Sequence, residues 1–312
     1  QRTVTHISVP KNLFEKETTA KARQLPKVLE GTGTFDLNDL EEVAGVMKQA
    51  RQPMILAGAG ARGAAGDIAE LATTWGAGIL LSLGGKGIFE DATPHLIQGI
   101  GEGGNPHAPN VFKDADVVLI AGATWWPEGY VPEGATIIHI DLHLEHAKKR
   151  VAADYGIKGK TEQVIPLLLE SMKGKQKNEE WLNRIDAVKE KWAYQNEQEG
   201  QIQGSPVHPS RIARGLENTV ADDAIIALDT GDVTVWMNRN FRQTNQKVLF
   251  SGYWRSMGFG LPAAIAAKLE QPEKQVVAVV GDGGIEMTLA DLLTATRYGL
   301  DITVVIFNNG AL

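Results

Sequence analysis

Four consecutive residues near the end of the chain, Gly281-Asp282-Gly283-Gly284, predict a glycine-rich turn that contains one carboxylate. Asn309 follows Asp282 by 27 residues and stands just after the apolar run 302–307. Asp and Asn side chains offer oxygen atoms, and glycine lets backbone N–H groups come close to a phosphate. Mg²⁺ prefers a few protein oxygens together with the phosphates of its ligand. These residue types at this spacing therefore predict a site that holds a diphosphate through a hard cation.

The segments that must position these residues predict a strand, a helix and a second strand. Residues 276–280 are continuously apolar and mostly β-branched, as in a strand buried on both faces of a parallel sheet. Residues 287–298 predict a helix with its leucines toward one side, and Gly299 suits the position just after it. Parallel strands end at the same sheet edge, so we expect Asp282 and Asn309 to be neighbours. An ordinary βαβ unit with a helix-capping Asp is the alternative.

The turn, the 27-residue spacing and the pair Asn308-Asn309 resemble the thiamine diphosphate motif of the decarboxylase and acetolactate synthase superfamily. The resemblance implies that Asp282 and Asn309 bind Mg²⁺ through their side chains. It also implies that the backbone carbonyl of Ala311 completes the protein's share of the metal ligands. We therefore expect two cofactors here, thiamine diphosphate and Mg²⁺.

A second segment, 256–269, resembles the family's loop under the cofactor and the Ala-rich helix that follows it. In the family, a bulky apolar side chain of this loop holds the cofactor in a bent V shape, and Met257 occupies that position. The resemblance also implies that the backbone of Arg255 accepts a hydrogen bond from the aminopyrimidine ring. Taken by itself, Met257 is more typical of a core residue. With the polar turn after residues 225–228 included, the residues implied to bind thiamine diphosphate are Gly231, Asp232, Gly281, Gly283 and Gly284.

A glycine-rich turn in the first half of the chain matches a dinucleotide-binding fingerprint, between a predicted strand at 53–57 and a predicted helix at 65–75. The acidic residue expected about 20 positions later is missing, which argues against a simple NAD site. The central domain of the resembled superfamily has this layout and binds FAD in some members. In the decarboxylases the domain is structural, so both alternatives stay open. The residues expected to bind FAD are Gly58, Gly60, Arg62, Ser82, Gly84, Gly122, Thr124, Trp126 and Asp141.

The segment Thr124-Trp125-Trp126-Pro127 resembles the aromatic-Pro segment of pyruvate oxidases and lacks the arginines that acetolactate synthases carry there. The resemblance therefore implies thiamine diphosphate- and Mg²⁺-dependent oxidative decarboxylation of pyruvate or a similar 2-oxo acid, with electrons passing to FAD. An acetolactate synthase-type carboligase and a non-oxidative 2-oxo acid decarboxylase are alternatives. Two further alternatives are a flavin-binding module without catalysis and an inert structural fragment. The pair Trp125-Trp126 also fits a role in a core or an interface.

Composition argues against several other classes of protein. The chain has 312 residues, is 43% hydrophobic and carries a net charge of −7. It has no basic stripe that would suit nucleic acid and no apolar stretch of about 18 residues that would span a membrane. Without Cys it has no disulfide, thiolate metal site or cysteine nucleophile. The histidines lack the spacing of a metal hydrolase, and no Gly-x-Ser-x-Gly elbow is present. We expect a cytoplasmic protein.

Predicted strands alternate with predicted helices, which indicates an α/β fold with two doubly wound parallel-sheet domains. We expect the end of a preceding domain and a linker at 1–38, a central FAD-type domain at 39–172, a charge-rich, solvent-facing linker helix at 173–205, and a truncated thiamine diphosphate-binding domain at 206–312. In the family, a preceding domain supplies an activating Glu across a dimer interface. We therefore expect this fragment to be inactive by itself, and the complete protein to be a dimer or tetramer.

Overall fold

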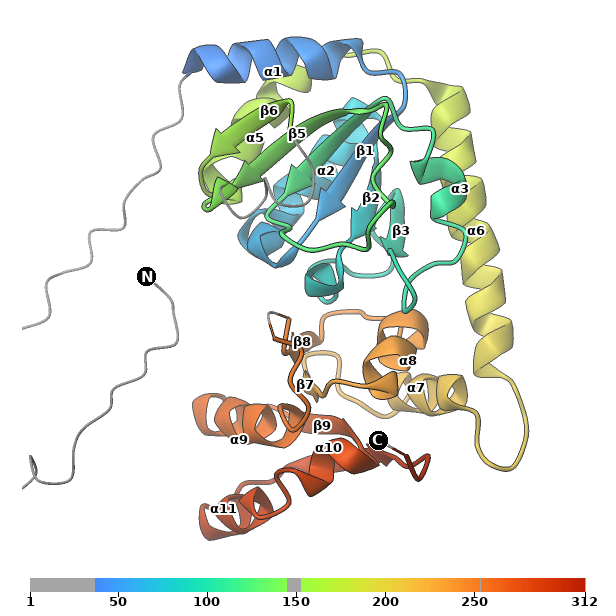
Figure 1. Cartoon of the computed structure of the whole chain (residues 1–312), viewed down its shortest axis with the longest axis vertical. Coiled ribbons are helices and arrows are strands. Elements are labelled where there is room, and N and C mark those ends of the chain that lie inside the picture. Colours follow the sequence, from blue (N-terminus) through green and yellow to red (C-terminus); the bar gives the residue numbers. More distant parts are fainter. Residues whose placement is uncertain (1–36, 145–152, 253, 312) are drawn as a thin grey trace, which may run out of the picture. The chain divides into compact units, whose positions relative to one another are not determined.

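Two parallel β-sheets run through the part of the chain that the computed structural model describes, residues 37–144, 153–252 and 254–311 (Figure 1). Helices flank both sheets, which confirms the predicted α/β class with two parallel-sheet domains. The strand and linker expected within 1–36 lie outside the described residues. No helix in the described ranges combines the length and the apolar character needed to cross a bilayer.

The first sheet has the strand order β3-β2-β1-β4-β5-β6, which is doubly wound. The predicted bounds of β1 and α2 are confirmed. The sequence analysis does not predict β3 and β6, because four-residue strands give little periodic signal. The elements are α1 (Leu37–Gln49), β1 (Pro53–Ala57), η2 (Ala59–Ala64), α2 (Ala65–Trp75), β2 (Gly78–Leu81), η3 (Leu83–Gly85), β3 (Leu96–Gly99), α3 (Pro109–Phe112), β4 (Val117–Ala121), β5 (Thr136–Asp141), β6 (Tyr155–Lys158) and α5 (Thr161–Met172).

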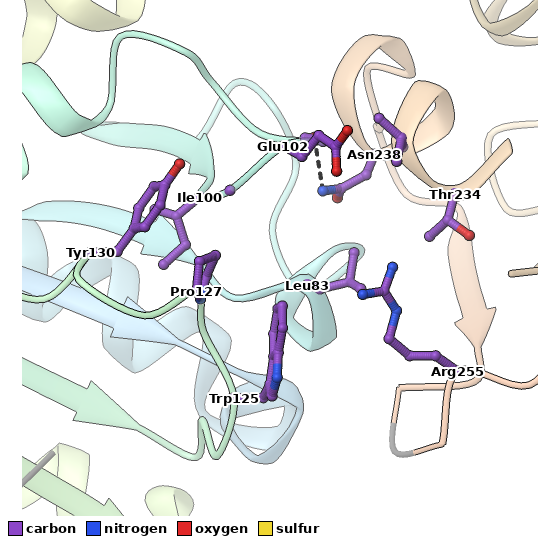
Figure 2. Close-up of a pocket in the computed structure, with 12 residues that line it drawn as sticks. Leu83, Ile100, Glu102, Trp125, Pro127, Tyr130, Thr234, Asn238 and Arg255 are labelled. Carbon is purple, nitrogen blue, oxygen red and sulfur yellow. Dashed lines mark hydrogen bonds between the residues drawn. The ribbon is translucent and has the colours of Figure 1, made fainter. Parts of the chain in front are cut away.

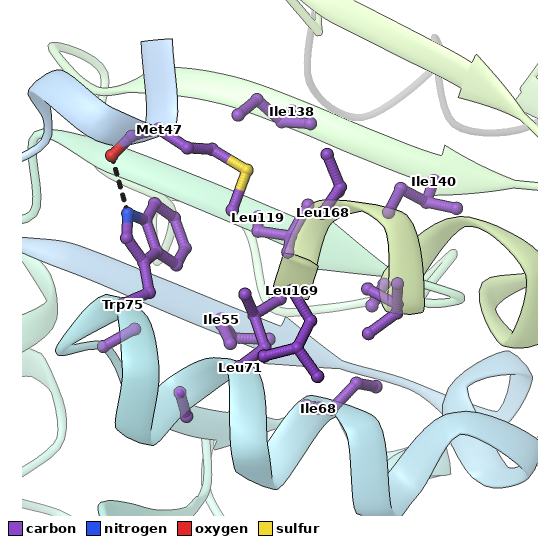
Figure 3. Close-up of a cluster of buried hydrophobic side chains, with 14 of the residues drawn as sticks. Met47, Ile55, Ile68, Leu71, Trp75, Leu119, Ile138, Ile140, Leu168 and Leu169 are labelled. Carbon is purple, nitrogen blue, oxygen red and sulfur yellow. Dashed lines mark hydrogen bonds between the residues drawn. The ribbon is translucent and has the colours of Figure 1, made fainter. Parts of the chain in front are cut away.

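One face of this sheet packs against α1, α2 and α5 (Figure 3). Side chains alternate along β1, so that Ile55 joins this cluster while Met54 and Leu56 join the cluster on the other face. The indole N–H of Trp75 in α2 donates to the backbone carbonyl of Met47 in α1 at 2.7 Å, which joins two helices over the same face. A core on both faces explains why β1 is continuously apolar.

The other face is covered by α3 and by the long helix α6 (Glu179–Gly200). Trp181, Leu182 and Ile185 of α6 are buried, and the indole N–H of Trp181 donates to the carbonyl of Pro53 at 3.1 Å. The expectation of a solvent-facing helix is therefore wrong for this side of α6. The many charged residues of the helix lie around a narrow apolar stripe, and it is this stripe that packs on the sheet.

The second sheet has the strand order β10-β9-β7-β8 and is also doubly wound, with β7 and β9 at its centre. His208 caps the first helix of this part of the chain, because its side chain accepts a hydrogen bond from the N–H of Ser210 at the beginning of the helix. The elements are α7 (Pro209–Glu217), β7 (Ile225–Leu228), α8 (Asp232–Asn240), β8 (Lys247–Phe250), α9 (Gly260–Glu270), β9 (Val276–Gly281), α10 (Asp282–Glu286), α11 (Asp291–Arg297) and β10 (Thr303–Phe307).

The prediction of a single helix over residues 287–298 is wrong. The structure has two short helices instead, α10 and α11, joined by a turn in which the N–H of Thr288 donates to the carbonyl of Ile285. The glycine turn itself becomes helical, so α10 begins directly at Asp282 and ends before the predicted start. The side chain of Leu293 is 73% exposed, so the leucine pattern does not mark a buried helix face in this structure.

Hydrogen bonds connect the first sheet and α6 to α8 and the residue that follows it. The buried ammonium group of Lys86 donates to the carbonyl of Phe241 at 2.8 Å, and burial lowers the pKa of this lysine. Glu199 at the end of α6 binds Arg239 of α8 with N–O distances of 2.6 and 2.9 Å. Burial raises the pKa of Glu199, but hydrogen bonds from Arg239 and Asn240 outweigh it, so that the pKa lies below its usual value. These bonds position α8 next to the loops of the first sheet.

Candidate functional site

The carboxyl ends of β7 and β9 lie side by side at the centre of the second sheet, where the chain winds outward in two directions. Ligands of open α/β sheets bind at such switch points. β7 is followed by Asp229, Thr230 and Gly231, and β9 ends at Gly281 directly before α10. Two of the segments predicted to bind thiamine diphosphate therefore share one sheet edge.

Asp282 and Asn309 come together at the adjacent ends of β9 and β10, which pair in register up to this edge. The N–H of Gly310 donates to Oδ2 of Asp282 at 2.8 Å, and the N–H of Ala311 donates to Oδ1 of Asn309 at 3.0 Å. A carboxylate has about four lone-pair sites, so Asp282 retains the capacity to bind a cation while it accepts this bond. The neighbouring positions expected from the sequence are present.

A metal at this edge would depend on oxygen ligands. No three His, Cys, Asp or Glu side chains gather as metal ligands within the ranges that the structure describes. One carboxylate, one amide oxygen and one backbone carbonyl leave the remaining coordination positions to water or to a phosphate. Mg²⁺ takes such a ligand set, whereas Zn²⁺ prefers nitrogen and sulfur ligands.

Two glycines of the turn, Gly283 and Gly284, are buried beneath this edge, whereas Gly281 is partly exposed. Gly283 and Gly284 are buried in the first turn of α10, where the leading N–H groups of a helix have no partner within the helix. Across the switch point, Gly231 has a φ of +138°, a conformation that favours glycine, and Asp232 is exposed at the start of α8. The structure thus brings the predicted diphosphate-binding residues to the carboxyl ends of two neighbouring strands, β7 and β9.

The loop that carries Met257 lies against the end of α10. Gly258 has a φ of +79°, and a Cβ placed on it would lie 3.1 Å from Cγ2 of Thr288 and 3.3 Å from Cβ of Met287. Met257 is half-buried, and Arg255 is exposed with a φ of +51°, in the left-handed region. The structure therefore places the predicted wedge residue beside the glycine turn.

The sequence analysis does not include Asp229 among the site residues. Its side chain is 1% exposed, and its carboxylate accepts hydrogen bonds from the N–H groups of Thr230, Gly258 and Phe259. A carboxylate directly after a buried strand at the switch point is the signal that could have identified it, because buried charged groups need partners.

The glycine turns of the first sheet also meet at a switch point, between β1 and β4. The N–H of Gly58 donates to Ala121 and the N–H of Gly60 donates to Gly122, both at 2.9 Å. A Cβ on Gly58 would lie 2.4 Å from the carbonyl oxygen of Gly122, so glycine is required by the close approach of two turns. Two of the N–H groups expected to face a nucleotide already bind backbone. Gly84 adjoins the same turn, because its Cβ would lie 3.4 Å from Cβ of Ala59.

The other residues predicted to bind FAD differ in exposure. Asp141 is buried and accepts a hydrogen bond of 2.8 Å from the N–H of His143, while the guanidinium of Arg62 donates to the carbonyl of Gly87 at 3.1 Å. Ser82 is buried and Thr124 is exposed. Trp126 is 3% exposed and its ring lies 6.2 Å from that of His139, in the core of the first sheet. Trp125 is the exposed member of the tryptophan pair.

A cavity of about 250 Å³ lies between loops of the first sheet and the helix α8 (Figure 2). Trp125, Pro127 and Tyr130 stand on one side of it, with Asn238 and Arg255 on the other. The guanidinium carbon of Arg255 is 5.8 Å from the ring centroid of Trp125. The cavity therefore combines aromatic and aliphatic walls with one cation, Arg255, and one carboxylate, Glu102. Its lining residues are Leu83, Ile100, Gly101, Glu102, Gly103, Trp125, Pro127, Tyr130, Thr234, Val235, Asn238 and Arg255.

Two family models match the chain. The model of the thiamine pyrophosphate enzyme central domain matches residues 40–168, and the model of the thiamine pyrophosphate enzyme C-terminal TPP binding domain matches residues 229–312. The first segment contains the whole first sheet, and the second contains β8, β9 and β10 of the second sheet together with the turn that follows β7. The chain belongs to the thiamine pyrophosphate enzyme family, which confirms the superfamily that the sequence motifs resemble.

The proteins to which the chain is similar are named for more than one reaction. The chain is 33% identical over 97% of its length to the Bacillus subtilis protein named "Putative thiamine pyrophosphate-containing protein YdaP". It is 28% identical over 88% of its length to the pyruvate oxidase of Lactiplantibacillus plantarum, and 27% identical over 98% of its length to the acetolactate synthase large subunit of Lactococcus lactis. The matches cover 53%, 46% and 54% of those proteins, so the chain spans about half the length of these relatives.

Proposed function

We propose that this chain forms the central and diphosphate-binding part of an enzyme that decarboxylates pyruvate or a similar small 2-oxo acid oxidatively. The cofactors are thiamine diphosphate, Mg²⁺ and FAD. The observation that carries the proposal is the meeting of Asp282, Asn309 and Ala311 at the ends of β9 and β10, beside the buried glycine turn. This arrangement supplies oxygen ligands for a cation next to backbone groups that suit a diphosphate.

In this proposal the protein binds and orients, and the bound thiamine diphosphate supplies the electron sink that lets CO₂ leave a 2-oxo acid. Asp282, Asn309 and the carbonyl of Ala311 hold Mg²⁺, and Gly283 and Gly284 permit close approach of the diphosphate. Met257 would pack against the bound cofactor, and the backbone carbonyl of Arg255 would accept a hydrogen bond from its aminopyrimidine.

The residues that line the cavity between the loops of the first sheet and α8 support the oxidative reaction. Trp125 and Pro127 belong to the segment that resembles pyruvate oxidases, and both line the cavity beside Arg255. Flat aromatic walls and one cation suit a flavin ring and its acceptor atoms. Bound FAD would accept the two electrons that remain when a 2-oxo acid loses CO₂, and water would supply the oxygen atom with which the remaining acyl group leaves as a carboxylic acid.

The fit of FAD is tested by the visible absorbance spectrum of the complete protein that contains this chain. We expect oxidised flavin bands in the purified protein, and we expect them to bleach when pyruvate, thiamine diphosphate and Mg²⁺ are added without oxygen. Flavin that stays oxidised while CO₂ is released would exclude electron transfer. Absence of flavin, with decarboxylation retained, would leave a non-oxidative decarboxylase or a synthase.

A carboligase is the second candidate, because acetolactate synthases match the chain about as closely as pyruvate oxidase does, at 27% against 28% identity. In that case the two-carbon group is transferred to a second 2-oxo acid and no electrons leave the substrate. Formation of a 2-hydroxy-3-oxo acid from pyruvate, measured in the same samples as the flavin spectrum, distinguishes the two. We propose that either enzyme acts as a dimer or tetramer.

A further inference from the structure

Asp229 is a buried carboxylate at the centre of the candidate site. Its side chain is 1% exposed and lies one residue beyond β7. Oδ1 accepts hydrogen bonds from the N–H groups of Thr230 at 2.7 Å and Phe259 at 3.1 Å, and Oδ2 accepts one from Gly258 at 3.2 Å. An ionised carboxylate is an acceptor only, so these three donors fit its chemistry.

The same carboxylate touches the glycine turn. A Cβ on Gly284 would lie 2.5 Å from Oδ2 of Asp229, a distance that no real Cβ contact adopts. Gly260, at the start of α9, is also closely packed, because its Cβ would lie 3.1 Å from Cβ of Asp229. The hydroxyl of Thr234 in α8 donates to the backbone carbonyl of Asp229 at 2.5 Å. One residue thus contacts the turn after β7, the loop before α9 and the turn after β9.

The two bonds to Gly258 and Phe259 fix the loop immediately after Met257. These N–H groups stand at the start of α9, where a helix offers no acceptor of its own. Hydrogen bonds to an ionised acceptor are shorter and stronger than neutral ones. Replacing the carboxylate would leave one buried and one partly buried donor poorly satisfied, so that the loop would relax away from the glycine turn.

We propose that Asp229 is a positioning residue of the thiamine diphosphate site, which sets the separation between Met257 and the Gly283-Gly284 turn through a single buried carboxylate. The proposal rests on the proposed function. Asp229 acts through the loop and the turn, with no contact to the substrate. Its removal therefore changes how tightly and in which geometry the cofactor is held, whereas a merely structural role would change only the stability of the fold.

The test compares Asp229→Asn with the control Asp301→Asn in the complete protein that contains this chain. Asp301 is an exposed carboxylate of the same domain, before β10 and at the opposite end of that strand from Asn309. Asn keeps the shape of Asp229 but turns an amide donor toward the loop or the turn. We expect thiamine diphosphate with Mg²⁺ to bind about tenfold or more weakly to Asp229→Asn, which corresponds to about 1.4 kcal/mol of binding free energy.

Two further readouts separate positioning from folding. The near-ultraviolet circular dichroism of the bound cofactor reports its geometry, and we expect it to change in Asp229→Asn at saturating cofactor and to be retained in Asp301→Asn. The effects of Asp229→Asn and Met257→Ala on cofactor affinity should be non-additive, because one acts through the other. Unchanged affinity and dichroism in a folded Asp229→Asn protein would overturn the proposal.

Asp229→Ser provides a second variant if the Asn protein does not fold, because it is smaller and retains one acceptor oxygen. We expect it to fold and to show the same loss of affinity. If both variants unfold, Asp229 is a folding residue and the proposal is wrong. Failure of the wild-type protein to bind thiamine diphosphate would instead contradict the proposed function, so the two failures are distinguishable.

Discussion

The carboxylate of Asp282 accepts a hydrogen bond of 2.8 Å from the backbone N–H of Gly310, which lies 28 residues further along the chain. This bond joins the end of β9 to the end of β10 and leaves Asn309 between them. The side chain of Asn309 is held in turn by the N–H of Ala311 at 3.0 Å. The proposed metal ligands are therefore fixed by the backbone of the strand ends, with no need for a bound ion to gather them.

Replacing Asn309 with Ala tests this geometry directly. We expect binding of thiamine diphosphate in the presence of Mg²⁺ to weaken about tenfold or more, which corresponds to about 1.4 kcal/mol. Isothermal titration calorimetry at fixed Mg²⁺ measures it. The matched control is Asn308→Ala, since Asn308 is the preceding residue and also accepts a bond from Gly310, at 3.1 Å. Equal effects of the two substitutions would argue against a metal-ligand role for Asn309.

The close contact between Gly284 and Asp229 predicts a loss of stability in Gly284→Ala. The added methyl group has no space beside the carboxylate, so we expect the free energy of unfolding to fall by about 1–3 kcal/mol, as for other overpacked sites. Urea unfolding without cofactor measures the loss. Gly281→Ala is the control, because no atom lies within 4 Å of its Cβ position and its φ is −82°. A Gly284→Ala protein as stable as the control would show that the turn yields easily.

The sequence predicted the strands, and the residues at the carboxyl ends of the second sheet's strands, better than it predicted the packing around them. The strand bounds at β1 and β7 and the proximity of Asp282 and Asn309 follow from apolar runs and from parallel topology. The division of this region into α10 and α11, in place of one helix at 287–298, does not follow from the sequence. A leucine pattern indicates an amphipathic helix but does not show where its first turn begins.

Two other features depend on contacts between segments far apart in the sequence. The buried side of α6 is set by a stripe of three apolar residues within a charged helix, which the overall composition hides. The position of Asp229 is informative only once the loop before α9 and the turn after β9 are seen to meet on it. Similarly, the fingerprint glycines of the first sheet are needed for the contact between two turns, which no single-strand pattern reveals.

The contact between Glu199 and Arg239 predicts a role for α6 in stability. Glu199 accepts bonds from Arg239, from Asn240 at 2.9 Å and from Gln195 at 2.8 Å, and its side chain is 17% exposed. We expect Glu199→Gln to lower the free energy of unfolding by about 2 kcal/mol, the scale of bonds to a charged group. Chemical denaturation measures it.

Glu170→Gln is the matched control for that measurement, because the pair of Glu170 with Lys173 is exposed on both sides. Exposed ion pairs contribute little, so we expect no measurable change in this variant. A Glu199→Gln protein that unfolds at the same denaturant concentration as the control would contradict a stabilising role for the contact.

His139 predicts a pH dependence of stability. Burial lowers its pKa, more than Asp141 and the bond to the backbone of Ala123 raise it. When the pH falls below the ordinary histidine pKa of about 6.5, His139 becomes protonated in the unfolded chain while it stays neutral in the folded protein. Proton binding therefore stabilises the unfolded state, and the free energy of unfolding decreases as the pH falls. We expect His139→Gln to lose less stability than wild type between about pH 7.5 and 5.5, by up to about 1.4 kcal/mol for each unit of lowered pKa. Urea unfolding at both pH values measures this, and identical losses in the two proteins would exclude His139 as a source.

Removal of the metal is the most direct test of the central claim, that Asp282 and Asn309 hold a diphosphate through Mg²⁺. The measurement is the dissociation constant of thiamine diphosphate for the complete protein that contains this chain, in Mg²⁺ and after chelation by EDTA, for wild type and Asp282→Asn. We predict tight binding to wild type only with Mg²⁺, and weak, Mg²⁺-independent binding to Asp282→Asn. Tight binding to wild type in EDTA, or an Asp282→Asn protein with the full Mg²⁺ response, would contradict the account.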